Sequence, residues 1–302
     1  MVSRPCPSPN AKNYPLSSAS GFSCIGWRTI SPKSPHTTSS PGLAGDLSDR
    51  RSAAEPRIPT NRESLTLEYY PRHCLKTGRL LAVEAMPRWP HRISGNFSST
   101  LNPTTLAERH AVRMSGITLL QMACTEAAQW PLPEVRLSIK LLTPLPNSEE
   151  LCLQISSVLT ESGLAAECLE LALPETFPYN LDEDSGIAFA SLRDIGVNLL
   201  LDEFGHAVAS LIALRDMPLT AMKVDRLMLR SLPADAANLA ILQAAVQTAH
   251  AMGLRVCADS VDLETLKKAL AAIGVDEGQG LAFTPPLSAE ELRGYLRATA
   301  RR

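Results

Sequence analysis

The chain has 302 residues, 45% of them hydrophobic, and carries 29 Lys and Arg against 31 Asp and Glu, for a net charge of -2. This length allows one large domain or two small ones, and the near-neutral charge gives no electrostatic reason to expect nucleic acid or a membrane surface as a partner. The seven cysteines are scattered without a C-x-x-C pair, which is typical of free thiols in a reducing compartment. No apolar run reaches the roughly 20 residues that span a bilayer. We therefore expect a cytoplasmic protein with no membrane and no nucleic-acid partner.

Residues 1–62 are rich in Ser and Pro, and their few apolar residues follow no period. A segment of this composition buries too little apolar surface to offset its conformational entropy. The sequence therefore predicts a disordered tail over 1–62 and a folded domain over 63–302. An over-long gene start is the other interpretation of the tail.

From residue 65 onward, short apolar runs alternate with longer helical patterns. The expected strands, in chain order, are 80–86, 135–142, 167–173, 196–204, 221–225, 254–259 and 278–283. Capping-box starts with Asn147 and Ser288 begin two of the helices, and Gly163 ends the first of these. Strands and helices that alternate at this spacing predict βαβ units, and roughly 235 residues suit a (β/α)8 barrel. A doubly wound open sheet is the alternative, but no G-x-G-x-x-G or P-loop motif supports it.

Charged and polar side chains recur where these expected strands end. The stretch LLLDEFG places two adjacent carboxylates, Asp202 and Glu203, at the end of one strand. The corresponding residues of the other strands are Glu84, Arg88, Lys140, Lys223, Asp259 and Gln279. The carboxyl ends of the strands form the active face of a (β/α)8 barrel. This recurrence predicts a charged pocket for a metal or a phosphate ligand.

The segments around these positions resemble the motifs of the EAL family, the bacterial phosphodiesterases that linearise cyclic di-GMP. The matching segments are YYPRHCLKTGR (69–79), VEAMPRW (83–89), DEFG (202–205), KVDR (223–226), ADSVD (258–262) and GQGLAF (278–283). The resemblance covers about 65–296 and implies a TIM-like barrel of the EAL type, in which one strand is commonly antiparallel. It also implies cyclic di-GMP as a ligand, and it leaves a protein partner or a homodimer open.

The resemblance assigns metal ligation to three of the carboxylates. Glu84 and Asp202 match metal ligands, and Glu203 stands where the family has a second Asp. In the family, two Mg²⁺ or Mn²⁺ ions on such oxygen ligands activate a water and clamp the phosphodiester.

Other matches concern the ligand and the catalytic groups. Lys223 matches the lysine near the attacking water, and Arg88 matches the arginine that contacts a ligand phosphate. Gln279 matches the pocket glutamine, and Glu175 matches a glutamate that orients the loop of the DEFG motif. The remaining matched acids are Asp259, at a catalytic position, and Asp262, at a ligand-binding position.

The departures from the family pattern fall on the metal site. Lys140 stands where the family has a ligand Asn, and Ala172 replaces a ligand Glu. Over seven matched positions the family pattern totals -4, whereas this chain totals -2, from four acids (Glu84, Asp202, Glu203, Asp259), two lysines (Lys140, Lys223) and Ala172. Two divalent cations bring +4, and a charged lysine has no lone pair for a metal. We expect the Lys140 ammonium to lie between Glu84 and Asp202 as a counter-charge, with no metal cofactor.

Three functions stay open. The first is a catalytically impaired module that binds cyclic di-GMP, through Arg88 and Lys140, or acts through a protein partner. The second is an active phosphodiesterase that uses Mg²⁺ or Mn²⁺ and forms linear pGpG. The third is a barrel that binds a protein partner and no nucleotide, favoured by Tyr70, which replaces the family's glutamine, and by the altered loop that contains His206.

Overall fold

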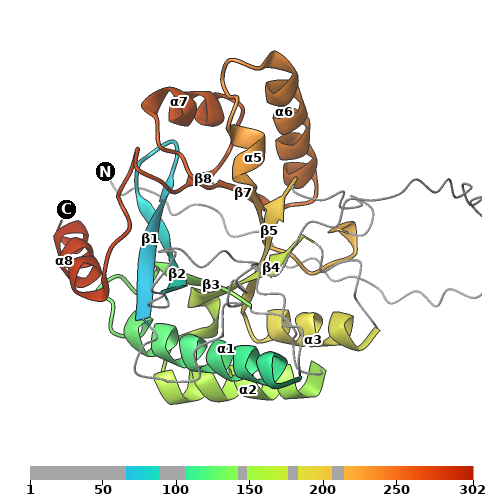
Figure 1. The fold of residues 1–302 in the computed structure, drawn as a ribbon, viewed down its shortest axis with the longest axis vertical. Coiled ribbons are helices and arrows are strands. Elements are labelled where there is room, and N and C mark those ends of the chain that lie inside the picture. Colours follow the sequence, from blue (N-terminus) through green and yellow to red (C-terminus); the bar gives the residue numbers. More distant parts are fainter. Residues whose placement is uncertain (1–65, 89–105, 142–147, 176–182, 206–213, 302) are drawn as a thin grey trace, which may run out of the picture. The chain divides into compact units, whose positions relative to one another are not determined.

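In the computed structural model, eight β-strands of the described residues close into a barrel in sequence order (Figure 1). The structure describes residues 66–88, 106–141, 148–175, 183–205 and 214–301. The strands are β1 (Thr66–Cys74), β2 (Leu80–Arg88), β3 (Arg136–Lys140), β4 (Leu169–Pro174), β5 (Asn198–Phe204), β6 (Ala221–Val224), β7 (Arg255–Ala258) and β8 (Glu277–Gly278). Strand β1 runs antiparallel to both of its neighbours, β2 and β8. The pairs from β2–β3 to β7–β8 are parallel.

Helices cover the outside of this barrel. They are α1 (Leu106–Ala127), α2 (Ser148–Ser162), α3 (Glu183–Asp194), α5 (Arg226–Leu229), α6 (Ala236–Ala251), α7 (Glu264–Ala272) and α8 (Ala289–Ala300), with a short 3-10 turn η2 (Ala166–Cys168). Helix α1 packs beside α2, and α2 packs beside α3, as Figure 1 shows in green and yellow-green. No helix within the described ranges is long and apolar enough to cross a membrane.

The predicted barrel and its antiparallel strand are confirmed. Helix α2 ends at Ser162, and Gly163 follows with a φ of +73°, as the sequence indicated. The capping box of α8 is present, because the Ser288 side chain accepts from the Glu291 N–H while the Glu291 side chain accepts from the Ser288 N–H. The predicted cap Asn147 lies outside the described residues.

Two strands differ from the prediction. The strand expected over 278–283 ends at Gly278, because the chain turns at Gly280, which has a φ of +141°. Strand β1 was not among the expected strands, and it contains Pro71, a residue that is unfavourable within a strand. The backbone tolerates this proline next to a register shift between Arg72 and His73, where the ladder to β2 is irregular.

Side chains inside the barrel follow the two-residue period of the strands. Near the amino end of each strand, Glu170 of β4 and Arg255 of β7 face the interior. Two residues further along the same strands, Ala172 and Cys257 face it. The buried apolar cluster at this middle level is Ala172, Leu200, Ala221 and Cys257. It separates charged side chains at the amino ends of the parallel strands from those at the carboxyl ends.

The charged side chains at the amino ends form a buried network around Arg72. Arg72 is fully buried, and it makes ion pairs with Glu170 and with Glu277, the second at 2.8 Å from its Nε. Arg136 and Arg255 each place a guanidinium nitrogen 2.6 Å from Glu277 Oε1. Burial alone would raise the pKa of Glu277, but Arg72 and then the other two arginines outweigh it and hold the pKa at about 2.

Replacing Arg72 with Met should lower the free energy of unfolding by about 3–5 kcal/mol, because it leaves two buried carboxylates short of a partner. Chemical denaturation at pH 7 measures this. Arg293→Met is the matched control, since Arg293 pairs with Glu126 at the surface and should change stability little. A loss from Arg72→Met no larger than that of the control would contradict the network's role.

Stability should also fall in acid, with a sign set by Glu277. Its folded pKa of about 2 lies below its usual value of 4.5, so the carboxylate adds stability above pH 4.5 that disappears as the pH falls to 2. Urea unfolding between pH 6 and pH 3 should show this decline, and Glu277→Gln should make it shallower. An equal slope in parent and variant would contradict the prediction.

Candidate functional site

The carboxyl ends of the parallel strands hold a group of buried and partly buried charged and polar side chains, which we call the mouth cluster. Its members are Glu84, Lys140, Asp202, Glu203, Lys223, Asp259 and Gln279. They come from β2, β3, β5 and β6 and from the residues that directly follow β7 and β8. On β5, for example, Leu199, Leu200 and Leu201 are fully buried and Asp202 follows directly.

Lys223 occupies the centre of the mouth cluster. Its Nζ lies 2.8 and 3.0 Å from the two oxygens of Glu84 and 3.1 Å from Asp202 Oδ1. Burial alone would lower the pKa of Lys223, but the carboxylates of Asp202 and Glu84 outweigh it and hold the pKa well above its usual value. The group therefore stays an ammonium and offsets one of the two negative charges of Glu84 and Asp202.

Lys140 binds the other side of Asp202. Its Nζ lies 2.6 Å from Glu203 Oε1 and 3.4 Å from Asp202 Oδ2. The expectation that Lys140 lies between Glu84 and Asp202 is therefore wrong for Glu84, because Lys140 pairs with Glu203 in its place. The Glu84 oxygens are taken by Lys223 and by Gln279, whose Nε2 donates to Oε2 at 2.5 Å. This leaves Glu203 and the second oxygen of Asp202 for Lys140.

The two lysines together determine the charge state of Asp202. Burial alone would raise its pKa, but Lys223 and then Lys140 outweigh it and hold the pKa below its usual value. Next to Lys140, the neighbouring strand presents Ala172, which pairs with Lys140 in the β3–β4 register and is fully buried. A methyl group there offers no ligand atom to a metal.

The end of β5 has a constrained backbone. Glu203 has a φ of +61°, and its N–H donates to Asp202 Oδ1 at 2.9 Å. Gly205 has a φ of +99°, and a Cβ there would come within 2.0 Å of Met228 Sδ. Its N–H donates to Glu175 Oε2 at 3.2 Å, and the loop-orienting role of Glu175 stays a prediction. His206 lies outside the described residues.

The remaining predicted acids, Asp259 and Asp262, lie in the segment that follows β7. Asp259 Oδ1 accepts from Gln279 Nε2 at 3.2 Å, which places Asp259 in the mouth cluster. Asp262 is exposed and accepts from the Leu281 N–H at 3.0 Å, so it ties together the segments that follow β7 and β8. Its ligand-binding role stays a prediction. Gly280 is needed between them, because a Cβ there would lie 2.5 Å from the Val261 backbone nitrogen.

Arg88 has a partner that the sequence analysis did not identify. The guanidinium is paired with Glu68 of β1, with Nε 2.9 Å from Oε2. Tyr70, two residues along β1, donates its hydroxyl to the same oxygen at 2.6 Å. Alternate positions along β1 would have indicated Glu68 and Tyr70 if 66–74 had been predicted as a strand.

The donors of the mouth cluster do not fit a pair of divalent ions as they stand. Within the described ranges, no three Asp, Glu, His or Cys side chains converge in a way that could hold a metal ion. The oxygens that would serve Mg²⁺ or Mn²⁺ on Glu84, Asp202 and Glu203 are engaged by the ammonium groups of Lys223 and Lys140. Two lysine ammonium groups therefore compensate part of the negative charge of this cluster, and they bond to the oxygens that a metal would need.

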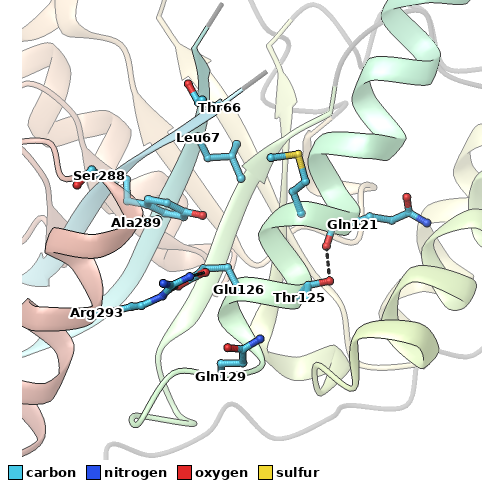
Figure 2. Close-up of a pocket in the computed structure, with 11 residues that line it drawn as sticks. Thr66, Leu67, Gln121, Thr125, Glu126, Gln129, Ser288, Ala289 and Arg293 are labelled. Carbon is cyan, nitrogen blue, oxygen red and sulfur yellow. Dashed lines mark hydrogen bonds and ion pairs between the residues drawn. The ribbon is translucent and has the colours of Figure 1, made fainter. Parts of the chain in front are cut away.

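A hollow of about 720 Å³ lies outside the barrel between β1, α1 and α8 (Figure 2). Leu67, Met122 and Ala289 contribute apolar surface to it. Its acid and its base, Glu126 and Arg293, meet in an ion pair in Figure 2. This groove lacks the clustered titratable groups of the mouth, which makes the mouth cluster the candidate functional site.

Known proteins share both the sequence pattern and the fold. The EAL domain model matches residues 53–286. The cyclic di-GMP phosphodiesterase PA2567 of Pseudomonas aeruginosa is 30% identical over 243 residues, which are 78% of this chain and 40% of that protein. The uncharacterised protein y4lL of Sinorhizobium fredii is 29% identical over 259 residues, 85% of this chain and 31% of that protein. The chain thus spans less than half the length of these relatives.

Solved structures give the same fold. A cyclic di-GMP complex of the PaMucR phosphodiesterase superposes with a TM-score of 0.68 at 24% identity, over 76% of this chain and 95% of that one. A manganese and cyclic di-GMP complex of Klebsiella pneumoniae BlrP1 gives a TM-score of 0.62 at 21% identity, over 78% of this chain and 58% of that one.

Lys140→Met should lower the free energy of unfolding at pH 7 by about 1–3 kcal/mol, because the variant keeps the side chain's length but leaves Asp202 and Glu203 under-compensated. The loss should shrink as the pH falls through the pKa of Asp202, which the missing ammonium raises. Added Mg²⁺ should raise the melting temperature of this variant and not that of the parent. Thermal unfolding at several pH values measures all three effects.

Lys268→Met, at an exposed position of α7, is the matched control and should melt like the parent. If Lys140→Met also melts like the parent, with and without Mg²⁺, then Lys140 does not compensate these acids.

Proposed function

Because this chain belongs to the EAL family of cyclic di-GMP signalling, we propose that it binds cyclic di-GMP at the carboxyl ends of its strands and hydrolyses it slowly or not at all. One observation carries the proposal. The Lys140 ammonium stands at a position where the family's pattern has a metal ligand, and it is bonded to two of the acids that would hold the ions. A binding or regulatory module keeps the fold and the ligand and does not need the metals.

The charge of the site supports this function. The mouth acids Glu84, Asp202, Glu203 and Asp259 bring four negative charges, and Lys140 and Lys223 return two. A net charge of -2 compensates half of the +4 that two divalent ions would add. Two cations would also have to approach two fixed ammonium groups. Two like unit charges 4 Å apart repel by roughly 4 kcal/mol at an intermediate dielectric constant.

The loss of ligand atoms on adjacent strands supports it independently. Lys140 and Ala172 are direct neighbours in the β3–β4 ladder, so the two replacements affect one side of the same site. A charged lysine donates hydrogen bonds only, and alanine has no side-chain donor or acceptor. Neither residue can take the place of a coordinating oxygen.

A ligand with two phosphates would then rely on cationic side chains. Arg88 lies at the end of β2, on the face of that strand that carries Glu84, and 44% of its side chain is exposed. Lys140 is 14% exposed and ends β3, the strand next to β2 in the barrel. Charge-assisted bonds from these two groups would hold the phosphates without a metal.

An active phosphodiesterase is the second candidate. Glu84, Asp202, Lys223 and Gln279 are all present, and they contact one another in the mouth cluster. The relative PA2567 carries that activity in its name. The metal ligands would be Glu84, Asp202 and Glu203, and the ions would supply Lewis-acid activation of a water. The present arrangement of donors does not favour this candidate.

A third candidate is a barrel that binds a protein partner and no nucleotide. It is favoured by one observation, which is that both prospective phosphate donors are already paired, Arg88 with Glu68 and Lys140 with Glu203. A cyclic di-GMP titration separates this candidate from the first.

We expect the full chain to bind cyclic di-GMP equally well with Mn²⁺ and with a chelator, and to release no linear dinucleotide at roughly 1 s⁻¹ or faster. Isothermal titration calorimetry measures the binding, and chromatography of the nucleotides measures the product. Binding that the chelator abolishes, or turnover with Mn²⁺ at such a rate, would support the active phosphodiesterase instead. Absence of binding under both conditions would favour the protein-binding barrel.

A matched variant restores the family's ligands. Lys140→Asn combined with Ala172→Glu removes one positive charge and adds one negative charge to the site, so its total returns to -4. This variant should gain a dependence of nucleotide binding on Mn²⁺ that the parent lacks.

A further inference from the structure

Glu68 lines the mouth of the barrel directly above the charged cluster. On β1 it shares one face with Tyr70 and Arg72, since side chains alternate along a strand. Arg72 points into the barrel, where it is fully buried against Glu170. The β1–β2 register sets Tyr70 opposite Glu84. Glu68 therefore faces the same interior, one step closer to the opening.

The Glu68 carboxylate holds Arg88 by the edge of its guanidinium. Arg88 Nε lies 2.9 Å from Glu68 Oε2, and Nη2 donates to both carboxylate oxygens. The pKa of Arg88 is raised, chiefly by this hydrogen bonding with Glu68. The Tyr70 hydroxyl fixes the carboxylate from the other side by donating to Oε2 at 2.6 Å.

A phosphate would compete for the same edge of Arg88. Carboxylates and phosphates both bind a guanidinium in the two-pronged fashion that uses neighbouring N–H groups. Glu68 already accepts hydrogen bonds from Nε and Nη2 of Arg88. Its negative charge would also repel a phosphate that approaches these nitrogens.

The ion pair between Arg88 and Glu68 is more exposed to solvent than the ion pair between Lys223 and Glu84 deeper in the site. The Arg88 and Glu68 side chains are 44% and 20% exposed, whereas those of Lys223 and Glu84 are 7% and 3% exposed. Water can replace either partner of the outer pair at little cost, because exposed ion pairs contribute little net stability. Breaking the inner pair would leave a buried charge without compensation.

We propose that Glu68 is an internal competitor for the phosphate-binding edge of Arg88, so that a phosphate of the ligand must displace a carboxylate of the protein. The inference rests on the proposed binding of cyclic di-GMP at the mouth. Glu68 thereby lowers the affinity for every anion that binds Arg88, by the few-fold amount that an exposed ion pair supplies. Tyr70 strengthens the competitor by orienting its carboxylate.

The test is isothermal titration of cyclic di-GMP into the full chain and its variants in the presence of a chelator. Glu68→Gln removes the charge and keeps the shape, and it should tighten binding by about 1.5- to fivefold, the range that the loss of an exposed ion pair implies. Tyr70→Phe should tighten it by less. Arg88→Ala should weaken it, and Glu68→Gln should give no gain when Arg88→Ala is also present.

The matched control is Glu126→Gln, which breaks another surface pair with an arginine, Arg293, on the outside of the barrel. It should bind like the parent. Binding by the parent that Glu68→Gln leaves equal or weaker would overturn this inference and leave the proposed function standing. A gain from Glu68→Gln that persists without Arg88 would overturn it too. Failure of both the parent and Glu68→Gln to bind would overturn the proposed function and the inference together.

Discussion

The site depends on two ammonium groups that neutralise carboxylates at partly desolvated strand ends. Lys223 binds Glu84 and one oxygen of Asp202, and Lys140 binds the other oxygen and Glu203. Acids gathered this closely need cations, and a barrel interior gives them little water. In the family's pattern divalent ions meet that need. In this chain the ammonium groups of Lys223 and Lys140 contact these acids, and we propose that the added Lys140 takes the place of a metal there.

The barrel carries charge at both ends and apolar side chains between them. At the amino ends of the strands, Arg72 compensates Glu170 and Glu277 in a fully buried network. The cluster that includes Ala172 and Cys257 separates this network from the mouth. The network around Arg72 therefore stabilises the fold. The mouth cluster remains accessible to a ligand at the end of the barrel where Arg88 is exposed. A change in one layer should leave the charges of the other largely unaffected, since an apolar layer lies between them.

Much of this could be predicted from the sequence, because helix caps, strand periods and strand-end charges are local features. The barrel, the end of α2 at Ser162 and the set of acids around Asp202 and Lys223 were all accessible in this way. Strand β1 was not, since Pro71 is unfavourable in a strand and a register shift accommodates it. Because β1 was not predicted, its residue Glu68 was not identified as the partner of Arg88.

Long-range pairing explains the other differences. Arg72, Glu170 and Glu277 lie far apart in the chain, so that no local pattern predicts that they meet inside the barrel. The partner of Lys140 depended on which atoms of Glu84 were already occupied by Lys223 and Gln279, which only the assembled site determines.

The most direct test of the central claim is a Mn²⁺ titration of the full chain without nucleotide, followed by electron paramagnetic resonance of the free ion. If the lysines take the place of the metals, the parent should show no saturable Mn²⁺ site, whereas Lys140→Asn combined with Ala172→Glu should bind the ion saturably. Two Mn²⁺ ions bound per chain of the parent would contradict the account, because both ammonium groups would then have to leave the acids that they neutralise.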